Sequence, residues 1–350
     1  MRESSSRKAR QELRRQILQN SNSRRSFIQK AVALGASVGI LPDVLAQNGW
    51  PQSPIQLIVP FSAGGATDVV ARAFANGLQG RLGKSVIVDN RTGAGGSIGT
   101  AAVARSKPDG LTLTVGLTSS LLVNQFQYKH LPYDPRRDLV LVSQLAIAPM
   151  AICVSEKVPA TNMAELRKYL ASRKGKVAYG SYGNGSYSHL VLEHMNRTLG
   201  AQMTHVPYRG ETAVVQALLG NEIDLGICSG VVAIPQVKAG KIRVVGITGP
   251  QRMEALAEIP TLIEQGMKDD AYRVVGWVGM AAPTNTPAEI IDRLAREAAT
   301  VMKSDSVKER LKGVGLVAVG NSPQQFKENY DREFQVWKRM FEASGATVLD

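Results

Sequence analysis

The sequence predicts an α/β fold made of two lobes. Short runs rich in β-branched residues alternate with longer segments of helical periodicity, a pattern typical of parallel sheets flanked by helices. Glycine turns between strands and helices fall into two groups, at 62–68 and 93–99 and then at 180–186. Two apolar extended stretches, 143–150 and 274–280, are suited to cross between lobes. We therefore expect two sheets, with candidate sites at the carboxyl ends of their strands.

The expected elements follow one another along the chain. Strands are expected at 55–59, 85–88, 112–115, 139–147, 151–154, 177–180, 203–206, 223–227, 244–247 and 274–280. Helices are expected at 68–82, 97–104, 163–174, 188–198, 212–219, 233–239, 288–303, 307–314 and 323–344. The helical, charged chain after Pro287 predicts a return to the first lobe and a helix packed on its surface.

The charge distribution argues against a nucleic-acid-binding protein. The chain has 350 residues and a formal net charge of +13, but nine Lys/Arg and only two Glu fall within residues 1–30. Beyond residue 46, 33 basic residues stand against 26 acidic ones, and no basic run is interleaved with aromatic residues. We therefore expect no nucleic-acid partner.

Residues 1–46 predict an export signal of the twin-arginine type. Arg24 and Arg25 precede an apolar stretch at 31–41, and residues 44–46 end in Ala46, which suits a signal peptidase. The apolar stretch is shorter than the roughly 20 residues that span a bilayer. An N-terminal anchor or a basic tail is the alternative. We expect a periplasmic protein with a cleavable signal.

Two short motifs raise the alternative of an enzyme. Residues 93–99 read GAGGSIG, whose glycine spacing is one residue longer than the dinucleotide-binding fingerprint of a dehydrogenase. Residues 226–230 read GICSG, a cysteine version of the nucleophile elbow, and a thiol-dependent hydrolase using Cys228 would need a histidine base. The sequence does not place any histidine beside Cys228; the candidates are His130, His189, His194 and His205.

The cysteines and histidines also bear on metal binding. Cys153 and Cys228 are the only cysteines, too few for a zinc site of four thiolates. Both lie in apolar strand-like runs, which predicts two buried structural cysteines, although a single bridge between them stays open. His189 and His194 lack the spacing of the HExxH zinc pair. We expect no metal and no cofactor.

Loops rich in N–H and hydroxyl donors follow, or nearly follow, several expected strands. These loops lie at 62–67, 93–97, 117–120, 181–186 and 208–210. Each alone is ordinary turn chemistry, but their convergence at strand ends favours a binding site. Donor-rich loops without an acid–base pair suit the capture of a carboxylate better than its conversion.

Blocks of sequence from about Trp50 to Val348 carry a family resemblance. They include PIQLIVPFSAGGATDVVAR at 54–72, YGSYGNGSYSHL at 179–190, HVPYRG at 205–210 and GWVGMAAPTNTP at 276–287. In this order the blocks resemble the Bug-type periplasmic solute-binding receptors of tripartite tricarboxylate transporters.

The resemblance implies a two-lobed periplasmic binding protein fold of the type II kind, with a ligand cleft between lobes joined by two strand crossings. It implies a first lobe at 47–147 and 277–350 and a second lobe at 148–276. The implied function is capture of a small carboxylate, an organic acid or an amino acid, for delivery to a membrane permease. A ligand-sensing scaffold without transport is the alternative, and a monomer is expected.

The resemblance also implies the ligand-binding residues. In the first lobe these are Phe61, Ser62, Gly64, Gly65, Thr67, Asp68, Thr118 and Ser119. In the second lobe they are Ser181, Asn184, Gly185, Ser186, His189, Tyr208, Gly210 and Cys228. Asp68 is expected to stabilise a helix start, to hold a bridging water or to meet an ammonium group.

The sequence departs from the family pattern at a few positions. Ala63 stands where the family often has proline, and Thr92 stands in a segment that commonly reads NRPGAGG. Cys228 and Ser229 lie where many members have an acidic residue followed by a polar one. The missing acid predicts a neutral distal pocket, suited to a ligand without a cationic group.

Overall fold

The structure is a computed structural model that describes residues 49–346 and 348–350. The predicted export signal, residues 1–46, lies outside the described residues. Residues Pro51–Asp350 form one compact unit. Within the described residues, none of the helices combines the length and hydropathy needed to cross a membrane.

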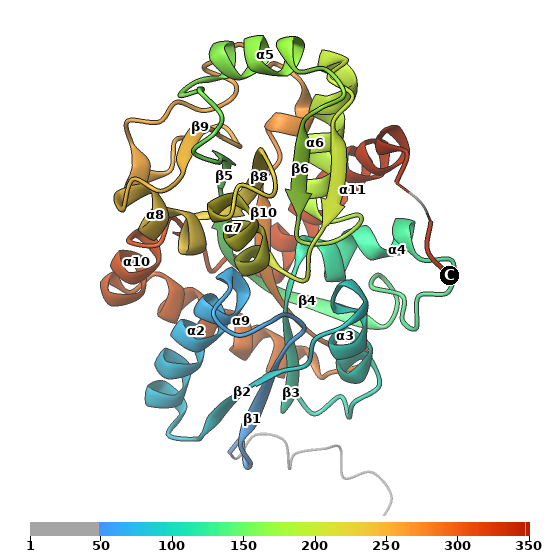
Figure 1. The fold of residues 1–350 in the computed structure, drawn as a ribbon. Coiled ribbons are helices and arrows are strands. Elements are labelled where there is room, and N and C mark those ends of the chain that lie inside the picture. Colours follow the sequence, from blue (N-terminus) through green and yellow to red (C-terminus); the bar gives the residue numbers. More distant parts are fainter. Residues whose placement is uncertain (1–48, 347) are drawn as a thin grey trace, which may run out of the picture. The chain divides into compact units, whose positions relative to one another are not determined.

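The first sheet has six strands in the order β11-β4-β10-β3-β1-β2 (Figure 1). β1 pairs in parallel with β2 and β3, whereas β10 runs antiparallel to β3 and β4. The strands are β1 (Ile55–Val59), β2 (Val86–Asn90), β3 (Thr112–Leu117), β4 (Leu139–Ala148), β10 (Gly276–Pro283) and β11 (Val317–Ala318). We call this sheet and the helices packed on it the first lobe.

The second sheet has five strands in the order β7-β6-β8-β5-β9. β6 pairs in parallel with β7 and β8, whereas β5 runs antiparallel to β8 and β9. The strands are β5 (Met150–Val154), β6 (Ala178–Ser181), β7 (Thr204–Pro207), β8 (Leu225–Ser229) and β9 (Arg243–Ile247). We call this sheet and its helices the second lobe.

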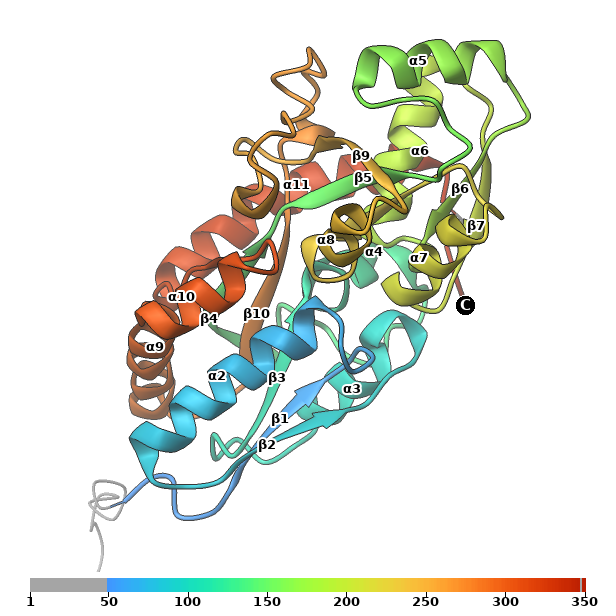
Figure 2. The same cartoon turned by 60° about the vertical axis from the view of Figure 1, so that its left-hand side comes forward.

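The helices cover both faces of the sheets. The first lobe carries α2 (Ala66–Leu82), α3 (Ser97–Ala104), α4 (Asn124–Gln127), α9 (Ala288–Met302), α10 (Asp305–Lys312) and α11 (Pro323–Ser344). The second lobe carries α5 (Met163–Ser172), α6 (Tyr187–Leu199), α7 (Glu211–Leu219) and α8 (Gly230–Lys238). The crossovers from β1 to β2 and from β2 to β3 run in opposite directions along the first sheet, and α2 and α3 lie on its opposite faces (Figure 2).

Double coverage explains the composition of the central strands. In β1, Ile55, Leu57, Ile58 and Val59 are all buried and only Gln56 is polar, so the strand lacks the regular alternation of a half-exposed strand. The same holds for β5 and β8, in which every residue is buried. The predicted positions of these strands are confirmed to within one or two residues.

Both sheets are mixed, because the crossings between lobes reverse the strand direction. β4 and β5 form a nearly continuous extended segment that leaves the first sheet and enters the second. β5 therefore begins at the sheet edge where β8 ends, with Met150 opposite Ser229. β10 enters the first sheet in the same way, with Val278 opposite Leu117 at the end of β3.

Some elements escaped the sequence analysis. The chain after β3 forms a π-helical turn at Ser119–Val123 that continues into α4, where the sequence predicted only a donor-rich loop. The two-residue strand β11 was also missed, because its pairing with β4 at Ile147 and Ala146 depends on a distant part of the chain.

Substitution of Gly279 tests how tightly the crossing strand β10 is packed. A Cβ at this position would lie 2.5 Å from Phe326 Cζ and 3.1 Å from Trp277 Cζ3. We expect Gly279→Ala to lower the free energy of unfolding by about 1–3 kcal/mol through overpacking, as measured by urea denaturation. Gly276→Ala on the same strand is the control, since its Cβ would meet only Ala148 O at 3.8 Å. Equal stability of the two variants would contradict the prediction.

Candidate functional site

The strand orders place a candidate site between the lobes. In each sheet the crossover direction reverses between two parallel strands, at β1 and β3 in the first and at β6 and β8 in the second. Ligands of open α/β sheets bind outside the carboxyl ends of strands at such a reversal. In each sheet the carboxyl ends of the parallel strands lie at the edge where the chain crosses between the lobes, through β4–β5 and through β10. The loops that follow these strands therefore lie on the two sides of one cleft.

The two lobes contact each other around this cleft. Gln127 Nε2 at the end of α4 donates a 2.6 Å hydrogen bond to Asn184 O in the second lobe. The rings of Tyr187 and Trp337 meet edge to face, with centroids 5.5 Å apart. A cavity of about 20 Å³, room for about one water molecule, is lined by residues of both lobes that include Thr118, Ser119, Tyr182, Tyr187, Gly276 and Trp337.

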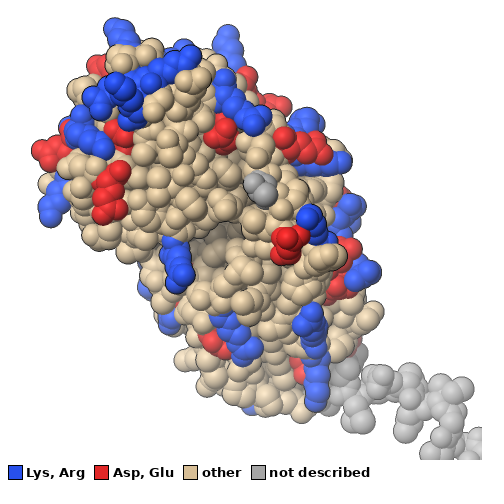
Figure 3. Space-filling model, turned by 45° about the vertical axis from the view of Figure 1, so that its right-hand side comes forward, with Lys and Arg blue, Asp and Glu red and all other residues tan. Residues whose placement is uncertain are grey.

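Charged side chains are sparse around the hollow visible between the upper and lower parts of Figure 3. Its walls are mainly uncharged residues, with a basic side chain at the rim. Across the described ranges, no group of His, Cys, Asp and Glu is arranged to hold a metal ion. The polar chemistry of the cleft therefore comes largely from backbone groups and hydroxyls.

Helix N-termini supply that chemistry. α2, α3, α6 and α7 begin after loops at the carboxyl ends of strands, and α8 follows β8 directly. The N-cap residues Gly65, Gly96, Gly210 and Ser229 form no side-chain hydrogen bond to their own helices, which leaves backbone N–H groups of the first turns available. Such ends carry partial positive charge and bind anions.

Asp68 closes the glycine turn that follows β1. Its carboxylate accepts hydrogen bonds from Gly64 N at 3.0 Å, Arg72 Nε at 2.9 Å and Asn90 Nδ2 at 3.1 Å. Asn90 also donates to Phe61 O at 3.0 Å, so one network holds both ends of the turn. Burial raises the pKa of Asp68, but the bonds from Arg72, Gly64 and Asn90 outweigh it and lower the pKa overall. The acid thus serves the turn and the start of α2.

The glycine-rich segment 93–99 lets backbones approach closely. A Cβ on Gly96, whose φ is +89°, would lie 2.9 Å from both the Phe61 ring and Ser120 Cβ. Gly99 packs against Pro60 and against Arg91 O in the same way. These contacts bring the loop after β2 against the loops after β1 and β3. The glycines of this segment are thus explained by close packing between loops, without a dinucleotide site.

Thr118 and Ser119 differ in their surroundings. Thr118 is buried, and its Oγ1 accepts a 3.0 Å hydrogen bond from Trp277 N at the start of β10. Its hydroxyl thus ties the end of β3 to a crossing strand. Ser119 is half-buried and lines the cavity between the lobes.

The loop 181–186 is braced by internal hydrogen bonds. Ser181 Oγ lies 3.0 Å from Gly183 O and 2.7 Å from His205 Nε2, and its side chain is fully buried. Ser186 caps α6 by accepting from His189 N at 3.3 Å and donates to Gly183 O at 2.6 Å. Asn184 is exposed at the tip of the loop.

Two stacked histidines support this loop from behind. The rings of His189 and His205 are nearly parallel, with centroids 4.0 Å apart, and Tyr179 stacks on the other face of His205 at 4.9 Å. His189 Nδ1 accepts a 3.0 Å hydrogen bond from Gly185 N, so this nitrogen carries no proton. Burial lowers the pKa of both histidines, and that of His205 to about 4. His189 is thus a structural support of the loop.

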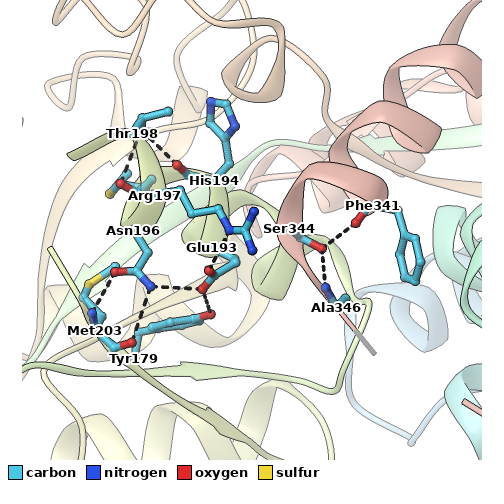
Figure 4. A network of polar contacts seen from close by, with 11 residues as sticks. Tyr179, Glu193, His194, Asn196, Arg197, Thr198, Met203, Phe341, Ser344 and Ala346 are labelled. Atoms are coloured by element: carbon cyan, nitrogen blue, oxygen red, sulfur yellow. Dashed lines mark hydrogen bonds and ion pairs between the residues drawn. The ribbon is translucent and has the colours of Figure 1, made fainter. Parts of the chain in front are cut away.

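Glu193 of α6 binds Tyr179, the outer ring of this stack (Figure 4). Its carboxylate accepts hydrogen bonds from Tyr179 OH at 2.8 Å, Asn196 Nδ2 at 3.1 Å and Arg197 Nε at 3.3 Å. Asn196 Oδ1 in turn accepts from Met203 N at 2.7 Å. The end of α11 lies beside this network, because a Cβ on Gly345 would collide with the Arg197 guanidinium.

The loop after β7 contributes Tyr208 and Gly210. Tyr208 N donates a 2.8 Å hydrogen bond to Ser181 O, which joins this loop to the previous one. Gly210 has a φ of +104° and begins α7. The next residue, Glu211, extends to the end of β8, where its Oε2 accepts from Ser229 Oγ at 2.5 Å and Ser229 N at 3.3 Å.

Cys228 lies inside the core of the second lobe. Its side chain is fully buried in the cluster formed by β5, α7 and α8, and Cys153 belongs to the same cluster. Both are free thiols, which confirms two buried structural cysteines. A hydrogen bond with Cys153 and burial raise the pKa of the Cys228 thiol.

Tyr182, Tyr187 and Glu211 were not predicted as functional residues from the sequence. Tyr182 and Tyr187 line the cavity, but the prediction for their loop rested on its glycines and serines. Glu211 was missed because its carboxyl reaches the site through a contact with Ser229, eighteen positions away. An acid at the expected start of a helix was the available signal for Glu211.

A family model and several solved structures match this chain. The model is described as the tripartite tricarboxylate transporter family receptor, and it matches residues 70–346. The R. palustris protein Rpa4515 with adipate is 32% identical with a TM-score of 0.81, covering 85% of this chain and 99% of that one.

Two further structures are similar at comparable levels. The periplasmic binding protein BugD is 30% identical with a TM-score of 0.78, covering 85% of this chain and 99% of that one. MatC from Rhodopseudomonas palustris with bound malate is 27% identical with a TM-score of 0.76, covering 83% of this chain and all of that one.

Asp68 makes stability depend on pH in the acid range. Its pKa lies below the ordinary 3.8, so its contribution is fully present above that pH and is lost as the pH falls through the folded-state pKa. We expect Asp68→Asn to lower the free energy of unfolding by about 1–3 kcal/mol at neutral pH, with a deficit that shrinks below pH 3.8. Asp89→Asn, which removes a half-exposed ion pair, should change little. A deficit independent of pH would contradict this assignment.

The histidine stack makes stability depend on pH in a higher range. The folded protein favours neutral His205, so its contribution is full above the ordinary pKa of 6.5 and is lost as the pH falls toward about 4. His205→Phe keeps an aromatic ring in the stack but removes the titration, and we expect its unfolding free energy to vary less over this range. His130→Gln, at an exposed position, should retain the wild-type profile in chemical denaturation. Identical profiles for wild type and His205→Phe would contradict the prediction.

Proposed function

The chain belongs to the tripartite tricarboxylate transporter receptor family, and from this premise we propose that it captures a small carboxylate between its two lobes. The Bug-type resemblance expected from the sequence is confirmed by this match and by the similarity to BugD. The proposed lobes are residues 47–147 with 277–350, and 148–276. The captured ligand is then delivered to the membrane permease of the transporter or presented to a sensor protein.

The meeting of several helix N-termini at one cleft is the observation that carries the proposal. α2 and α3 begin on the first-lobe side, and α6, α7 and α8 begin on the second-lobe side. Their backbone N–H groups attract a carboxylate without any cationic side chain. The adipate of Rpa4515 and the malate of MatC are both carboxylates, which supports the same ligand class here.

We assign the carboxylate to the first-lobe loops. Phe61, Ser62, Gly64, Gly65 and Thr67 surround the start of α2, and Ser119 faces the cavity. Asn184, Gly185 and Ser186 form the opposing loop with Tyr208 and Gly210. Asp68, Thr118, Ser181 and His189 act through the loops that they hold in place.

Ligand binding and lobe closure are coupled in this proposal. A ligand that touches both lobes favours the closed state by its higher affinity for that state. The hydrogen bond from Gln127 to Asn184 O and the contact between Tyr187 and Trp337 belong to the closed arrangement. The protein acts as a monomer, without a cofactor and without turnover of its ligand.

The protein acts in the periplasm in this proposal. BugD is a periplasmic binding protein, and the twin-arginine pattern at Arg24 and Arg25 offers an export route. Cleavage of the signal after Ala46 would release the two lobes, and N-terminal sequencing of the exported protein tests this site.

Ligand capture is testable on purified, unheated protein. Mass spectrometry of released small molecules is expected to identify a carboxylate, and that compound should raise the melting temperature. Stabilisation should reach about 2.7 kcal/mol when the free ligand is at a hundredfold excess over Kd. Consumption of the ligand, or the absence of stabilisation by any carboxylate, would contradict capture without turnover.

Gly185 tests whether the closed contact contributes to affinity. A Cβ on Gly185 would collide with the Gln127 side chain of the first lobe, so Gly185→Ala should weaken carboxylate binding at least about tenfold. Gly200→Ala is the matched control, because Gly200 has a similar φ of +60° but open space around its Cβ position. The double variant Gly185→Ala, Gln127→Ala should recover part of the affinity, as measured by isothermal titration calorimetry.

A further inference from the structure

Glu211 places a carboxyl group at the carboxyl end of β8, where the crossover direction of the second sheet reverses. It is the first residue of α7, and its side chain reaches Ser229, the last residue of β8 and the N-cap of α8. The carboxyl lies close enough to Tyr182 to raise the pKa of that phenol, in addition to the larger effect of burial. Tyr182 lines the cavity between the lobes together with Thr118 and Ser119 of the first lobe.

The Glu211 carboxyl has no cationic partner in the part of the chain that the structure describes. Its only side-chain hydrogen bonds there come from Ser229 N and Ser229 Oγ, and both end on Oε2. The second oxygen, Oε1, accepts no hydrogen bond among the described residues, yet it is not among their fully enclosed unpaired atoms. Burial raises the pKa of this acid. Oε1 is therefore an unpaired acceptor that keeps some contact with solvent.

Glu211 also occupies the anion-binding position of its own lobe. The N-termini of α7 and α8 meet at this point, and their partial positive charge stabilises a negative group. The N–H and the hydroxyl of Ser229 are donors of the kind that would receive a ligand carboxylate, but Glu211 already uses both. A second carboxylate arriving here would find these donors taken and a like charge beside it.

An acidic side chain lies near Cys228 even though position 228 itself is not acidic. The sequence predicted a neutral distal pocket because Cys228 lies where many family members have an acidic residue. The Glu211 carboxyl nevertheless lies beside Ser229 and contributes to the raised pKa of the neighbouring Cys228 thiol. The acid lies on the first turn of α7 instead of at the end of β8.

We propose that Glu211 selects a monocarboxylate whose far end carries a hydrogen-bond donor, a hydroxyl or an ammonium group, and disfavours dicarboxylates. This inference rests on the proposed capture of a carboxylate. The ligand carboxylate binds at the N-terminus of α2, and the distal donor binds Glu211 Oε1. The proposed ligand has one carboxylate, whereas the adipate of Rpa4515 and the malate of MatC each have two.

Length-matched probes test this selection. For each chain length from malonate to adipate, calorimetry compares the straight dicarboxylate with the unsubstituted monocarboxylate and with the monocarboxylates that end in a hydroxyl or an amine. Measurements at about pH 7.5 keep every carboxylate and ammonium group ionised. The wild-type protein is expected to bind the best donor-ended probe at least about tenfold more tightly than the dicarboxylate of equal length. The hydroxyl and amine arms identify which donor is preferred.

Glu211→Gln removes the charge while keeping the side-chain length. The preference over the dicarboxylate is expected to fall at least about tenfold, and an amine-ended probe should lose the most affinity. Glu222→Gln is the control, because Glu222 is exposed beyond the other end of α7. Equal melting temperatures of the two variants would show that Glu211→Gln leaves the fold intact.

The outcomes separate the two proposals. Tight binding of dicarboxylates with no change in Glu211→Gln would overturn the role of Glu211 and leave carboxylate capture standing. Unsubstituted monocarboxylates binding as tightly as the donor-ended probes would also overturn it. Failure of every carboxylate to bind would overturn the capture function and this inference together.

Discussion

The cleft depends on how the chain crosses between the lobes. β4 passes into β5 as one extended segment, and β10 returns the chain to the first sheet beside β3 and β4. Each crossing strand enters its new sheet from the edge where the parallel strands end. Because loops at carboxyl ends lead into helices, this single constraint points the N-termini of α2, α3, α6, α7 and α8 toward a shared space.

Much of the fold could be predicted from local sequence. The strand at Ile55–Val59 and the helices at Ser97–Ala104 and Pro323–Ser344 have the predicted bounds, since apolar runs, glycine turns and helical periodicity are local signals. Strand direction at the crossings could not be read in this way. It depends on which sheet an extended segment joins, and that is settled by contacts between distant parts of the chain.

The loops of the candidate site could be predicted from the sequence, but the side chains that support them could not. Glycine and serine clusters mark turns at strand ends, so Gly64, Gly185 and Ser186 could be named as candidates. The support behind them comes from elsewhere in the chain: His205 stacks on His189, Gln127 reaches Asn184, and Glu211 reaches Ser229. No local pattern reports such pairings, because they arise only when separate strands and helices pack together.

The position of Trp337 has an optical consequence. Its indole is fully buried on α11, touches Tyr187 of α6 edge to face, and shares the half-buried Glu333 carboxylate with the Trp277 indole. A rotation that draws α6 away from α11 would bring water to this indole and shift its emission to longer wavelength. The protein thus contains an intrinsic fluorophore at the boundary of its lobes, and their opening and closing can be followed in time without a label.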